Sequence, residues 1–246
     1  MQRSLTIDQI EQLKAFETCL VADAIESFGV RLRNEGFAIG GFRCLFKNLP
    51  PTVGYAATCK LRSADPPIVG SRYEERTDLW KHIVSIPAPR VIVMQDIDDP
   101  PGTGAFVGMV HANILMALGC VGAITNGTAR ELSGIEASGF QVFARRLAIS
   151  RAYIHVVEFG GPVEVGNLVI QPGDLIHGDR HGIITVPKEL VQRLPATAEA
   201  IREKKRQLIA LSRKPETTLE DFSQGLKDLL DFHPDSLRDG AKPWKR

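Results

Sequence analysis

Residues 91–125 read VIVMQDIDDPPGTGAFVGMVHANILMALGCVGAIT and contain the pattern that decides the fold. Residues 91–95 are a short β-branched run that predicts a buried strand, and residues 98–104 form a loop rich in aspartate, proline and glycine. Residues 107–118 suit a helix, and residues 121–125 suit a second short buried strand. This order predicts a βαβ unit with parallel strands, and ligands of open α/β sheets commonly bind at the edge where such strands end.

The part of the chain before this unit predicts two helices and a strand. Thr6 precedes Gln9 by the three residues of a helix capping box, so a helix is expected to begin there. A second helix is predicted over residues 21–28, because Gly29 supplies a typical end. Residues 54–61 alternate well enough for a strand, so helices should precede the first strand of the sheet.

The part of the chain after residue 142 predicts short strands followed by helices. The expected strands are residues 154–159, 163–165, 168–170 and 182–186. A long charged helix is predicted over residues 188–211, with a break near Pro195, and residues 217–232 suit one more amphipathic helix. The predicted organisation is a single domain over residues 1–213 with a C-terminal helical tail over residues 214–246.

The composition argues for one hydrophobic core. A chain of 246 residues suits one domain with appendages better than two full domains. The 30 lysines and arginines nearly balance the 29 aspartates and glutamates, so the charge gives no argument for nucleic acid or an anionic membrane as a partner. The four cysteines lack metal-site spacing and predict buried thiols in a reducing compartment. No export signal is visible and no apolar run approaches the roughly 20 residues that span a bilayer, so we expect a soluble cytoplasmic protein.

Arg130 and Glu131 follow the second strand of the βαβ unit and a predicted turn at Asn126-Gly127. An arginine offers a planar fork for a carboxylate or a developing enolate, and an adjacent carboxylate can hold a hard divalent cation such as magnesium. In isolation, the commoner explanation of such a pair is an ion pair at the start of a helix. The location at a sheet edge is therefore the reason to consider it as a site.

The segment before the βαβ helix offers a candidate anion site. Gly102, Gly104 and Gly108 precede an apolar helix, and free backbone N–H groups at such a terminus favour a carboxylate. The same glycines can equally serve close packing of helix and strand. His111 lies early in that helix, where it can face the pocket of Arg130 or be structural.

Two further groups of residues carry alternative explanations. His177 and His181 flank a Gly-Asp-Arg segment that suggests a metal site, but the pattern is also what a tight strand connection needs, and we favour the turn. Glu199 and Glu203 lie in the predicted long helix, where they can pair with Lys204 and its neighbours or reach a neighbouring active site.

Several segments together resemble a known family. The likeness is carried by residues 21–24, 53–58, 119–131 (GCVGAITNGTARE), 140–144, 161–163 and 169–187 (VIQPGDLIHGDRHGIITVP). They are similar to the 4-hydroxy-4-methyl-2-oxoglutarate / 4-carboxy-4-hydroxy-2-oxoadipate aldolases, a family that also contains the regulators of ribonuclease E activity. The last segment is the most specific.

The resemblance implies an α/β fold, a layered αββα sandwich like the swivelling phosphohistidine domain, with a C-terminal helical extension. It implies a homotrimer or hexamer with sites between protomers, and a Mg²⁺ or Mn²⁺ cofactor. The implied reactions are retro-aldol cleavage of 4-hydroxy-2-oxo diacids to pyruvate and decarboxylation of oxaloacetate. The small 2-keto acid substrate would then be the partner, with no nucleic acid and no membrane.

The resemblance also assigns roles to residues. Arg130 would bind and polarise the keto acid, Glu131 would be the metal ligand, and a glutamate, Glu203 or Glu199, would arrive from the next protomer. The substrate carboxylate would be held by the backbone at Gly108, Met109 and Val110.

Three positions depart from the family's pattern. Met109 stands where the aldolases carry an acidic residue thought to orient a water, and Gly134 stands where a further acidic residue is expected. Glu131 replaces an aspartate and lengthens the ligand by a methylene. These departures keep two alternatives open: a non-catalytic oligomeric binding or regulatory protein, or a related chemistry in which His111 supplies acid–base catalysis. The leading hypothesis is a metal-assisted lyase whose site spans residues 108–131.

Overall fold

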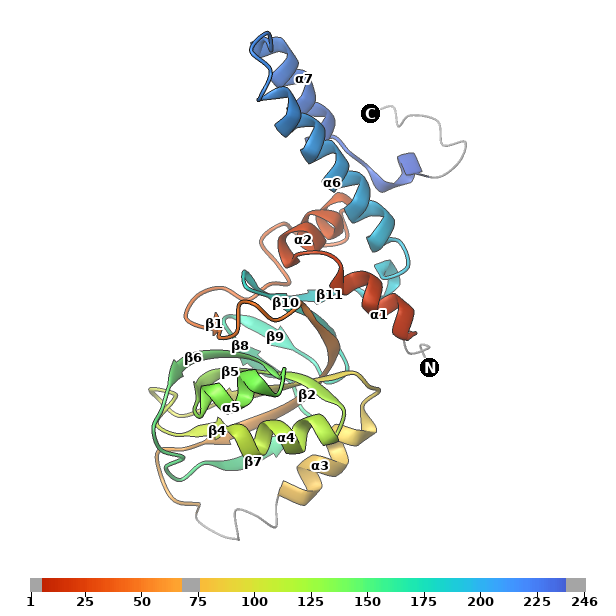
Figure 1. The fold of residues 1–246 in the computed structure, drawn as a ribbon. Coiled ribbons are helices and arrows are strands. Elements are labelled where there is room, and N and C mark those ends of the chain that lie inside the picture. Colours follow the sequence, from red (N-terminus) through yellow and green to blue (C-terminus); the bar gives the residue numbers. More distant parts are fainter. Residues whose placement is uncertain (1–5, 68–75, 238–246) are drawn as a thin grey trace.

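The computed structural model describes residues 6–67 and 76–237 (Figure 1). Its α-helices are α1 (Ile7–Lys14), α2 (Thr18–Ser27), α3 (Arg76–Ser85), α4 (Met109–Ala117), α5 (Leu132–Ala137), α6 (Leu194–Leu211) and α7 (Leu219–Leu230). Its strands are β1 (Arg43–Cys44), β2 (Thr52–Arg62), β3 (Arg90–Asp96), β4 (Ala105–Val107), β5 (Cys120–Ala129), β6 (Gln141–Leu147), β7 (His155–Phe159), β8 (Val163–Val165), β9 (Leu168–Ile170), β10 (Leu175–Asp179) and β11 (Gly182–Val186).

The predicted βαβ unit is confirmed. Strands β3 and β5 pair in parallel, with Val93 opposite Ile124, and α4 lies between them in the chain. In the described part of the chain, the main sheet has nine strands, with the order β1-β6-β5-β3-β2-β10-β11, while β4 pairs with β5 and β7 with β2. Strands β2, β3, β5 and β6 are parallel neighbours. Their C-terminal ends therefore meet at one edge, where the following loops can build a site.

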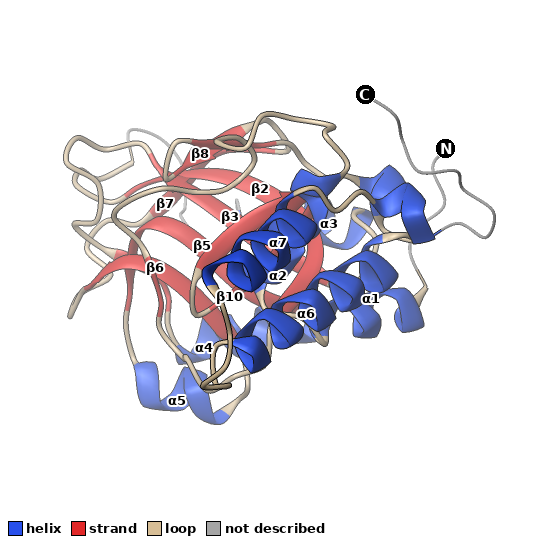
Figure 2. Ribbon diagram, turned by 90° about the horizontal axis from the view of Figure 1, so that it is seen from above, coloured by secondary structure: helices blue, strands red, loops and turns tan. Residues whose placement is uncertain are grey.

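Helices and a small second sheet cover the faces of this main sheet (Figures 1 and 2). Strand β2 shows the division, because its successive side chains point to opposite faces. Ala57 and Cys59 join a core cluster with side chains of α3 and α4, whereas Ala56 packs with the β8–β9 hairpin. Nearer the start of β2, Val53 and Tyr55 pack with α1, α2 and α6. The mixed α/β class and the layers of helix and sheet match the prediction.

The two predicted N-terminal helices are present with adjusted limits. Helix α1 begins after Thr6, whose side chain accepts a hydrogen bond from the N–H of Gln9 in a complete capping box. Helix α2 begins three residues before the predicted start, at Thr18, and the chain after it turns at Gly29 with a φ of 63°. Its buried side chains face the core cluster around β10 and β11.

The predicted turn at Asn126-Gly127 is wrong, because β5 continues through both residues to Ala129. The Asn126 side chain occupies the place of a backbone pair: its Oδ1 accepts from the N–H of Asp96 at 2.7 Å, and its Nδ2 donates to the Asp96 carbonyl at 2.9 Å. These bonds extend the contact between β3 and β5 beyond Thr125, the last residue in their backbone pairing. The Asn126 side chain thus replaces the backbone hydrogen bonds that would otherwise pair β5 with β3 at this position.

Four other strands and one thiol differ from the expectation. Strand β4 takes the first residue of the predicted helix, which begins only at Met109, and β1, β6 and β10 are additional strands. Cys44, Cys59 and Cys120 are buried as expected, but Cys19 is exposed. Burial raises the pKa of Cys59 and of Cys120 to about 12, so both thiols stay neutral.

The C-terminal helices lie beyond the sheet and form a hairpin that projects from it (Figure 1). Pro195 lies in the first turn of α6, where its missing N–H costs nothing, so the predicted break falls before this helix. Helix α7 follows the capping residue Thr218 and leaves none of its residues buried. The proposed boundary near residue 213 stays a prediction. Within the described ranges, no helix has both the length and the apolar character to cross a membrane.

Candidate active site

The site is built where β4, β5 and the start of α4 meet. Strands β4 and β5 are parallel neighbours, with Val107 opposite Ala129. Immediately after this pair, the N–H of Arg130 donates to the Val107 carbonyl at 3.0 Å. The chain that leaves β5 is thereby joined to the chain that enters α4. Arg130 and Glu131 consequently stand beside the first turn of that helix.

Glu131 has a backbone conformation that directs its side chain back toward α4. Its φ of 58° and ψ of 43° are left-handed, which is uncommon and costs about 1 kcal/mol for a residue with a side chain. In this conformation, one carboxylate oxygen accepts from the Met109 N–H at 2.8 Å and the other from the Arg130 guanidinium at 2.6 Å. Gly108 leaves space for this carboxylate, since a Cβ there would lie 2.7 Å from Glu131 Oε2 and the side chain would have to shift.

The electrostatics of Glu131 keep its carboxylate ionised. The hydrogen bond from the Met109 N–H lowers the pKa of Glu131 below its ordinary value of 4.5, and the bond from Arg130 lowers it further. The charge of Arg151 acts in the same direction. The carboxylate therefore holds the Arg130 guanidinium as a charged partner near neutral pH, so that the arginine is positioned before any ligand enters.

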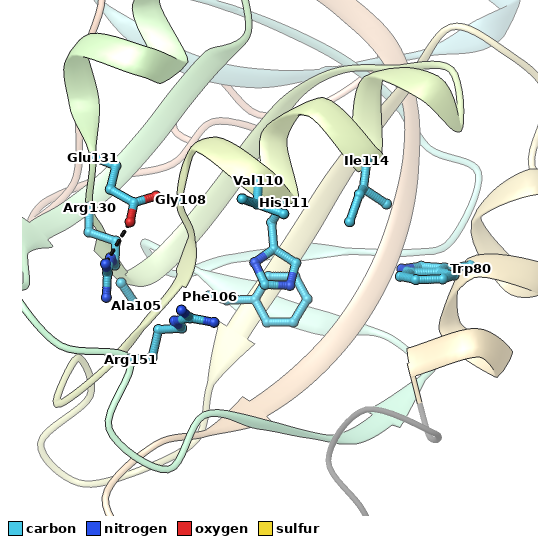
Figure 3. A pocket seen from close by; sticks show the side chains of 10 residues that line it. All are labelled: Trp80, Ala105, Phe106, Gly108, Val110, His111, Ile114, Arg130, Glu131 and Arg151. Carbon is cyan, nitrogen blue, oxygen red and sulfur yellow. Dashed lines mark hydrogen bonds and ion pairs between the residues drawn. The ribbon is translucent and has the colours of Figure 1, made fainter.

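These residues border a cavity of about 190 Å³ (Figure 3). Its wall comes from α3, β4, α4, the end of β5 and the loop after β6. The lining residues are Trp80, Ala105, Phe106, Gly108, Val110, His111, Ile114, Arg130, Glu131 and Arg151. Arg130, Arg151 and Glu131 gather at one end, and Trp80 and Ile114 lie at the other (Figure 3). The cavity thus has a charged end and an apolar end.

Most of the predicted site residues are brought together by the fold. Gly108, Val110, His111, Arg130 and Glu131 all line the cavity. The His111 ring packs against the Phe106 ring, with the ring centroids 5.0 Å apart. This contact places the imidazole between the charged and apolar ends (Figure 3). Their catalytic and binding roles stay predictions.

Met109 lies at the start of α4, and its predicted substrate-binding role, which concerned its backbone, stays a prediction. Its N–H donates to Glu131, but its side chain is not among those that line the cavity and packs over α5. A Cβ at position 134 would lie 2.5 Å from Met109 Sδ and 2.8 Å from its Cγ. The absence of a side chain at Gly134 therefore makes room for Met109. The two departures from the family's acidic pattern are neighbours in space, and each is compatible with the other.

Glu203 and Glu199 lie on α6, away from the cavity within one chain (Figure 1). Glu203 contacts Arg206 at 3.7 Å and accepts from Gln207 at 3.2 Å. Glu199 forms an ion pair with Arg202, whose hydrogen bond lowers the pKa of the glutamate. The arrival of either carboxylate from a neighbouring protomer is not tested by a single chain and stays a prediction.

Five residues of the wall were not among the predicted site residues: Trp80, Ala105, Phe106, Ile114 and Arg151. Arg151 is held near β4 because the Ala105 N–H donates to the Ser150 carbonyl at 3.1 Å. A signal for it existed, since Arg151 follows β6 as Arg130 follows its parallel neighbour β5. Trp80 comes from α3, and nothing in its local sequence distinguishes it from a core residue.

Among the described residues that line the cavity, Glu131 is the only carboxylate that could bind a divalent cation. Within residues 6–67 and 76–237, no group of three or more His, Cys, Asp or Glu side chains could hold a metal ion. The Glu131 side chain is 39% exposed, and a carboxylate has about four acceptor positions, of which two are used. Mg²⁺ is commonly held by one or two carboxylates, with water and substrate oxygens completing the shell. Glu131 is suited to that single-ligand role.

The histidine and aspartate cluster of the β10–β11 hairpin is structural, as the turn interpretation expected. His177 is fully buried, and its ring nitrogens bond to Thr18 Oγ1 at 3.0 Å and to the Leu13 carbonyl at 3.1 Å. Asp179 accepts from the N–H of Thr18 at 2.9 Å and from the N–H of His181 at 2.8 Å. These bonds attach α1 and α2 to the sheet and close the turn.

The comparisons with known proteins agree on one family. The model of the RraA-like family, described as Aldolase/RraA, matches residues 18–185. An uncharacterized protein of Methanocaldococcus jannaschii is 29% identical over 107 residues, which are 43% of this chain and 51% of that protein. The chain therefore spans about half the length of this relative.

A second relative and one solved structure extend the likeness. A putative 4-hydroxy-4-methyl-2-oxoglutarate aldolase of Halalkalibacterium halodurans is 26% identical over 184 residues, 74% of this chain and 78% of that protein. The crystal structure of Streptomyces coelicolor RraAS2, described as an unusual member of the RNase ES inhibitor RraA protein family, superposes with a TM-score of 0.63. That match has 17% identity and covers 87% of this chain and 100% of the other, so it shows a shared fold.

Proposed function

The chain belongs to the RraA-like family, Aldolase/RraA, and from that premise we propose that it is a lyase that cleaves small 2-keto acids to release pyruvate. The proposed reactions are retro-aldol cleavage of 4-hydroxy-2-oxo acids and decarboxylation of oxaloacetate, both of which pass through the enolate of pyruvate. The observation that carries the proposal is the cavity in which Glu131 holds Arg130 in place beside the first turn of α4. The aldolase name of one relative supports the same reaction type.

The arginines give the cavity its affinity for a keto acid. Arg130 and Arg151 both line it, and a guanidinium binds a carboxylate through two parallel hydrogen bonds. Because the Arg130 side chain is only 24% exposed, its charge acts in a partly dehydrated setting, where electrostatic interactions are stronger than in water. A cation fixed in this way stabilises the negative charge that develops on the keto oxygen during bond cleavage.

The proton transfers of the retro-aldol reaction require one group that accepts and returns a proton. His111 lines the cavity and is the proposed base. It takes the proton of the C4 hydroxyl, the C3–C4 bond breaks, an aldehyde leaves, and the electron pair enters the C2–C3 bond with charge on the keto oxygen. Return of the proton from His111 to C3 gives pyruvate. Arg130 neutralises the oxygen throughout.

Glu131 would hold Mg²⁺ or Mn²⁺ when the cation is bound, and the cation would polarise the keto group as a Lewis acid. The same carboxylate keeps Arg130 oriented through the bond of 2.6 Å. Removal of the cation with a chelator should then slow turnover, whereas removal of Glu131 should both weaken cation binding and release the arginine.

The experiment that tests the proposal is a pyruvate-release assay. Purified protein with Mg²⁺ or Mn²⁺ is given a 4-hydroxy-2-oxo acid or oxaloacetate, and pyruvate is measured with a coupled dehydrogenase. We expect release that depends on the cation and on Arg130. No pyruvate from either substrate, or an Arg130→Ala variant that works as well as the unchanged protein, would contradict the proposal.

A position of the site between protomers is a second part of the proposal. We expect a homotrimer or hexamer in which Glu203 of one copy approaches Arg130 of another. Variants Arg130→Ala and Glu203→Ala should each be inactive, while mixed assemblies refolded from both should regain part of the activity. Mixing without recovery, in assemblies shown by mass spectrometry to contain both variants, would argue against shared sites.

The packing of Met109 over Gly134 favours a second candidate function. Met109 and Gly134 stand where the resemblance to the aldolases predicts acidic residues, and their mutual packing suits a non-catalytic binding or regulatory protein of the RraA type. This alternative predicts that the protein binds neither a divalent cation nor a keto acid in calorimetry, but does inhibit a ribonuclease of the E type in a cleavage assay.

A further inference from the structure

The apolar end of the cavity points to the substrate class, and this inference rests on the proposed keto-acid lyase function. We infer that the preferred substrate is a 2-keto monocarboxylate whose tail beyond C4 is apolar and roughly the size of a phenyl ring, in place of the second carboxylate of a diacid. The cavity is divided into a charged end and an apolar end, and each end suits a different part of such a substrate (Figure 3).

The charged end of the cavity is suited to the substrate carboxylate. Arg130 and Arg151 both line it beside Glu131, and a guanidinium binds a carboxylate through two parallel hydrogen bonds. The three gather on one side of the cavity (Figure 3). A keto acid carboxylate seated there places its carbon chain toward the middle of the cavity.

The middle of the cavity is bordered by flat and apolar groups. Phe106 is buried and stacks with His111 at a tilt of 31°. An aromatic pair of this kind forms a wall against which a keto acid chain or a second ring can pack. His111 therefore lies beside the bond that would be cleaved, while the tail passes beyond it.

The far end of the cavity offers no charged partner among the described residues that line it. Trp80 and Ile114 form this end, and both side chains are largely apolar (Figure 3). A second substrate carboxylate placed there would lose its hydration without gaining a cation, which is costly. A phenyl or branched aliphatic group would instead bury apolar surface against Trp80 and Ile114, which is favourable.

A matched pair of unreactive keto acids tests the inference by calorimetry in the presence of Mg²⁺. The pair is 2-oxo-4-phenylbutanoate and 2-oxoglutarate, which share the first four carbons and differ only in phenyl or carboxylate at C4. We expect the phenyl compound to bind at least about tenfold more tightly, from the area that a buried ring removes from water. The same order should appear in kcat/KM for cleavage of 4-hydroxy-2-oxo-4-phenylbutanoate and 4-hydroxy-2-oxoglutarate.

A charge placed at the apolar end should reverse this order. Ile114→Lys supplies a cation near the tail, so 2-oxoglutarate should gain affinity and the phenyl compound should lose it. Met116→Lys is the matched control, because Met116 is an exposed apolar residue of the same helix outside the cavity. It should leave the ratio of affinities unchanged.

The outcomes separate the two proposals. Equal affinities, or tighter binding of 2-oxoglutarate by the unchanged protein, would overturn the substrate class but leave the keto-acid function standing if Arg130→Ala abolishes both. A ratio that Ile114→Lys does not change would also overturn it, because the tail would then lie elsewhere. Failure of both compounds to bind would overturn the inference together with the proposed function.

Discussion

Glu131 and Asp179 are two carboxylates with the same kind of partners and different places in the molecule. Each accepts from a backbone N–H of a remote segment, Met109 or Thr18, and each has a basic neighbour in the chain. The Glu131 side chain is 39% exposed at a cavity, whereas that of Asp179 is 6% exposed at the end of β10.

The hydrogen bonds of the two carboxylates also have different roles. Burial alone raises the pKa of Asp179, but hydrogen bonds from the N–H groups of His181 and Thr18 more than offset it and lower that pKa. Helix α2 has no side-chain cap of its own at Glu17, so Asp179 satisfies the first N–H of the helix from another part of the fold. The pair around Asp179 is therefore structural, and exposure to a cavity distinguishes the pair around Glu131 as the candidate site.

The largest expected effect is the loss of turnover in Arg130→Ala. Removal of a charged donor from the developing enolate should lower kcat/KM for pyruvate release by about 100- to 1000-fold. Arg180→Ala is the matched control, because this exposed arginine also neighbours a carboxylate but lies in the β10–β11 turn. Similar losses of kcat/KM in both variants would show that the loss follows from removing any arginine beside a carboxylate, and does not depend on the cavity.

The next effect is on stability in Asp179→Ala. Two N–H groups lose a charged acceptor at a buried position, which should lower the free energy of unfolding by about 2–4 kcal/mol in urea denaturation. Glu131→Ala is the comparison: its donors can turn to water, so stability should change by less than about 1 kcal/mol while turnover is lost. The comparison would be refuted by an Asp179 variant as stable as the unchanged protein.

A smaller effect is the pH dependence that His177 gives to stability. Burial lowers the pKa of His177 from its ordinary 6.5, so the unfolded chain takes up a proton at a pH where the folded chain does not. The free energy of unfolding should therefore fall as the pH drops below 6.5, by at most about 1.4 kcal/mol per pH unit. His177→Gln should weaken this dependence when urea denaturation is repeated between pH 7.5 and 5.5. An unchanged dependence would mean that other groups cause it.

The smallest effect is the coupling between Met109 and Gly134. Gly134→Ala improves helix propensity in α5 by about 1 kcal/mol but places a methyl group against Met109. In a Met109→Ala background the methyl has space, so the same change should stabilise more, by roughly 0.5 kcal/mol or above. A double-mutant cycle from urea denaturation measures the difference. Additive effects would mean that Met109 moves aside freely.

The parts of the fold that follow local rules were predictable from the sequence. The capping residues Thr6 and Thr218 and the β-branched run at β3 act within a few residues, so their patterns are visible in the chain. Asn126 was misassigned because its amide bonds to Asp96, and that partner comes from another strand. Strand β4 has three residues in a glycine-rich loop, too few to show any periodicity.

The candidate site likewise combines residues that the local sequence indicates with residues that only the packing of the fold brings in. Arg130 and Glu131 were found because they follow a recognisable strand, but Trp80 enters the cavity from α3, and that placement depends on how the helix packs. The sequence prediction for Met109 concerned its backbone, together with that of Gly108 and Val110, whereas the structure also places its side chain. Its packing over Gly134 depends on the position of α5 relative to α4, which no spacing in the sequence reveals.

Arg130 in this cavity is proposed to stabilise the enolate of pyruvate, and hydrogen exchange of pyruvate is the sharpest test of that role. In D₂O with Mg²⁺, proton NMR follows the loss of the pyruvate methyl signal, a measurement that is independent of the aldehyde formed in cleavage. We expect exchange with the unchanged protein and with Arg180→Ala, and none above background with Arg130→Ala. Absence of exchange with the unchanged protein, or equal exchange with Arg130→Ala, would contradict it.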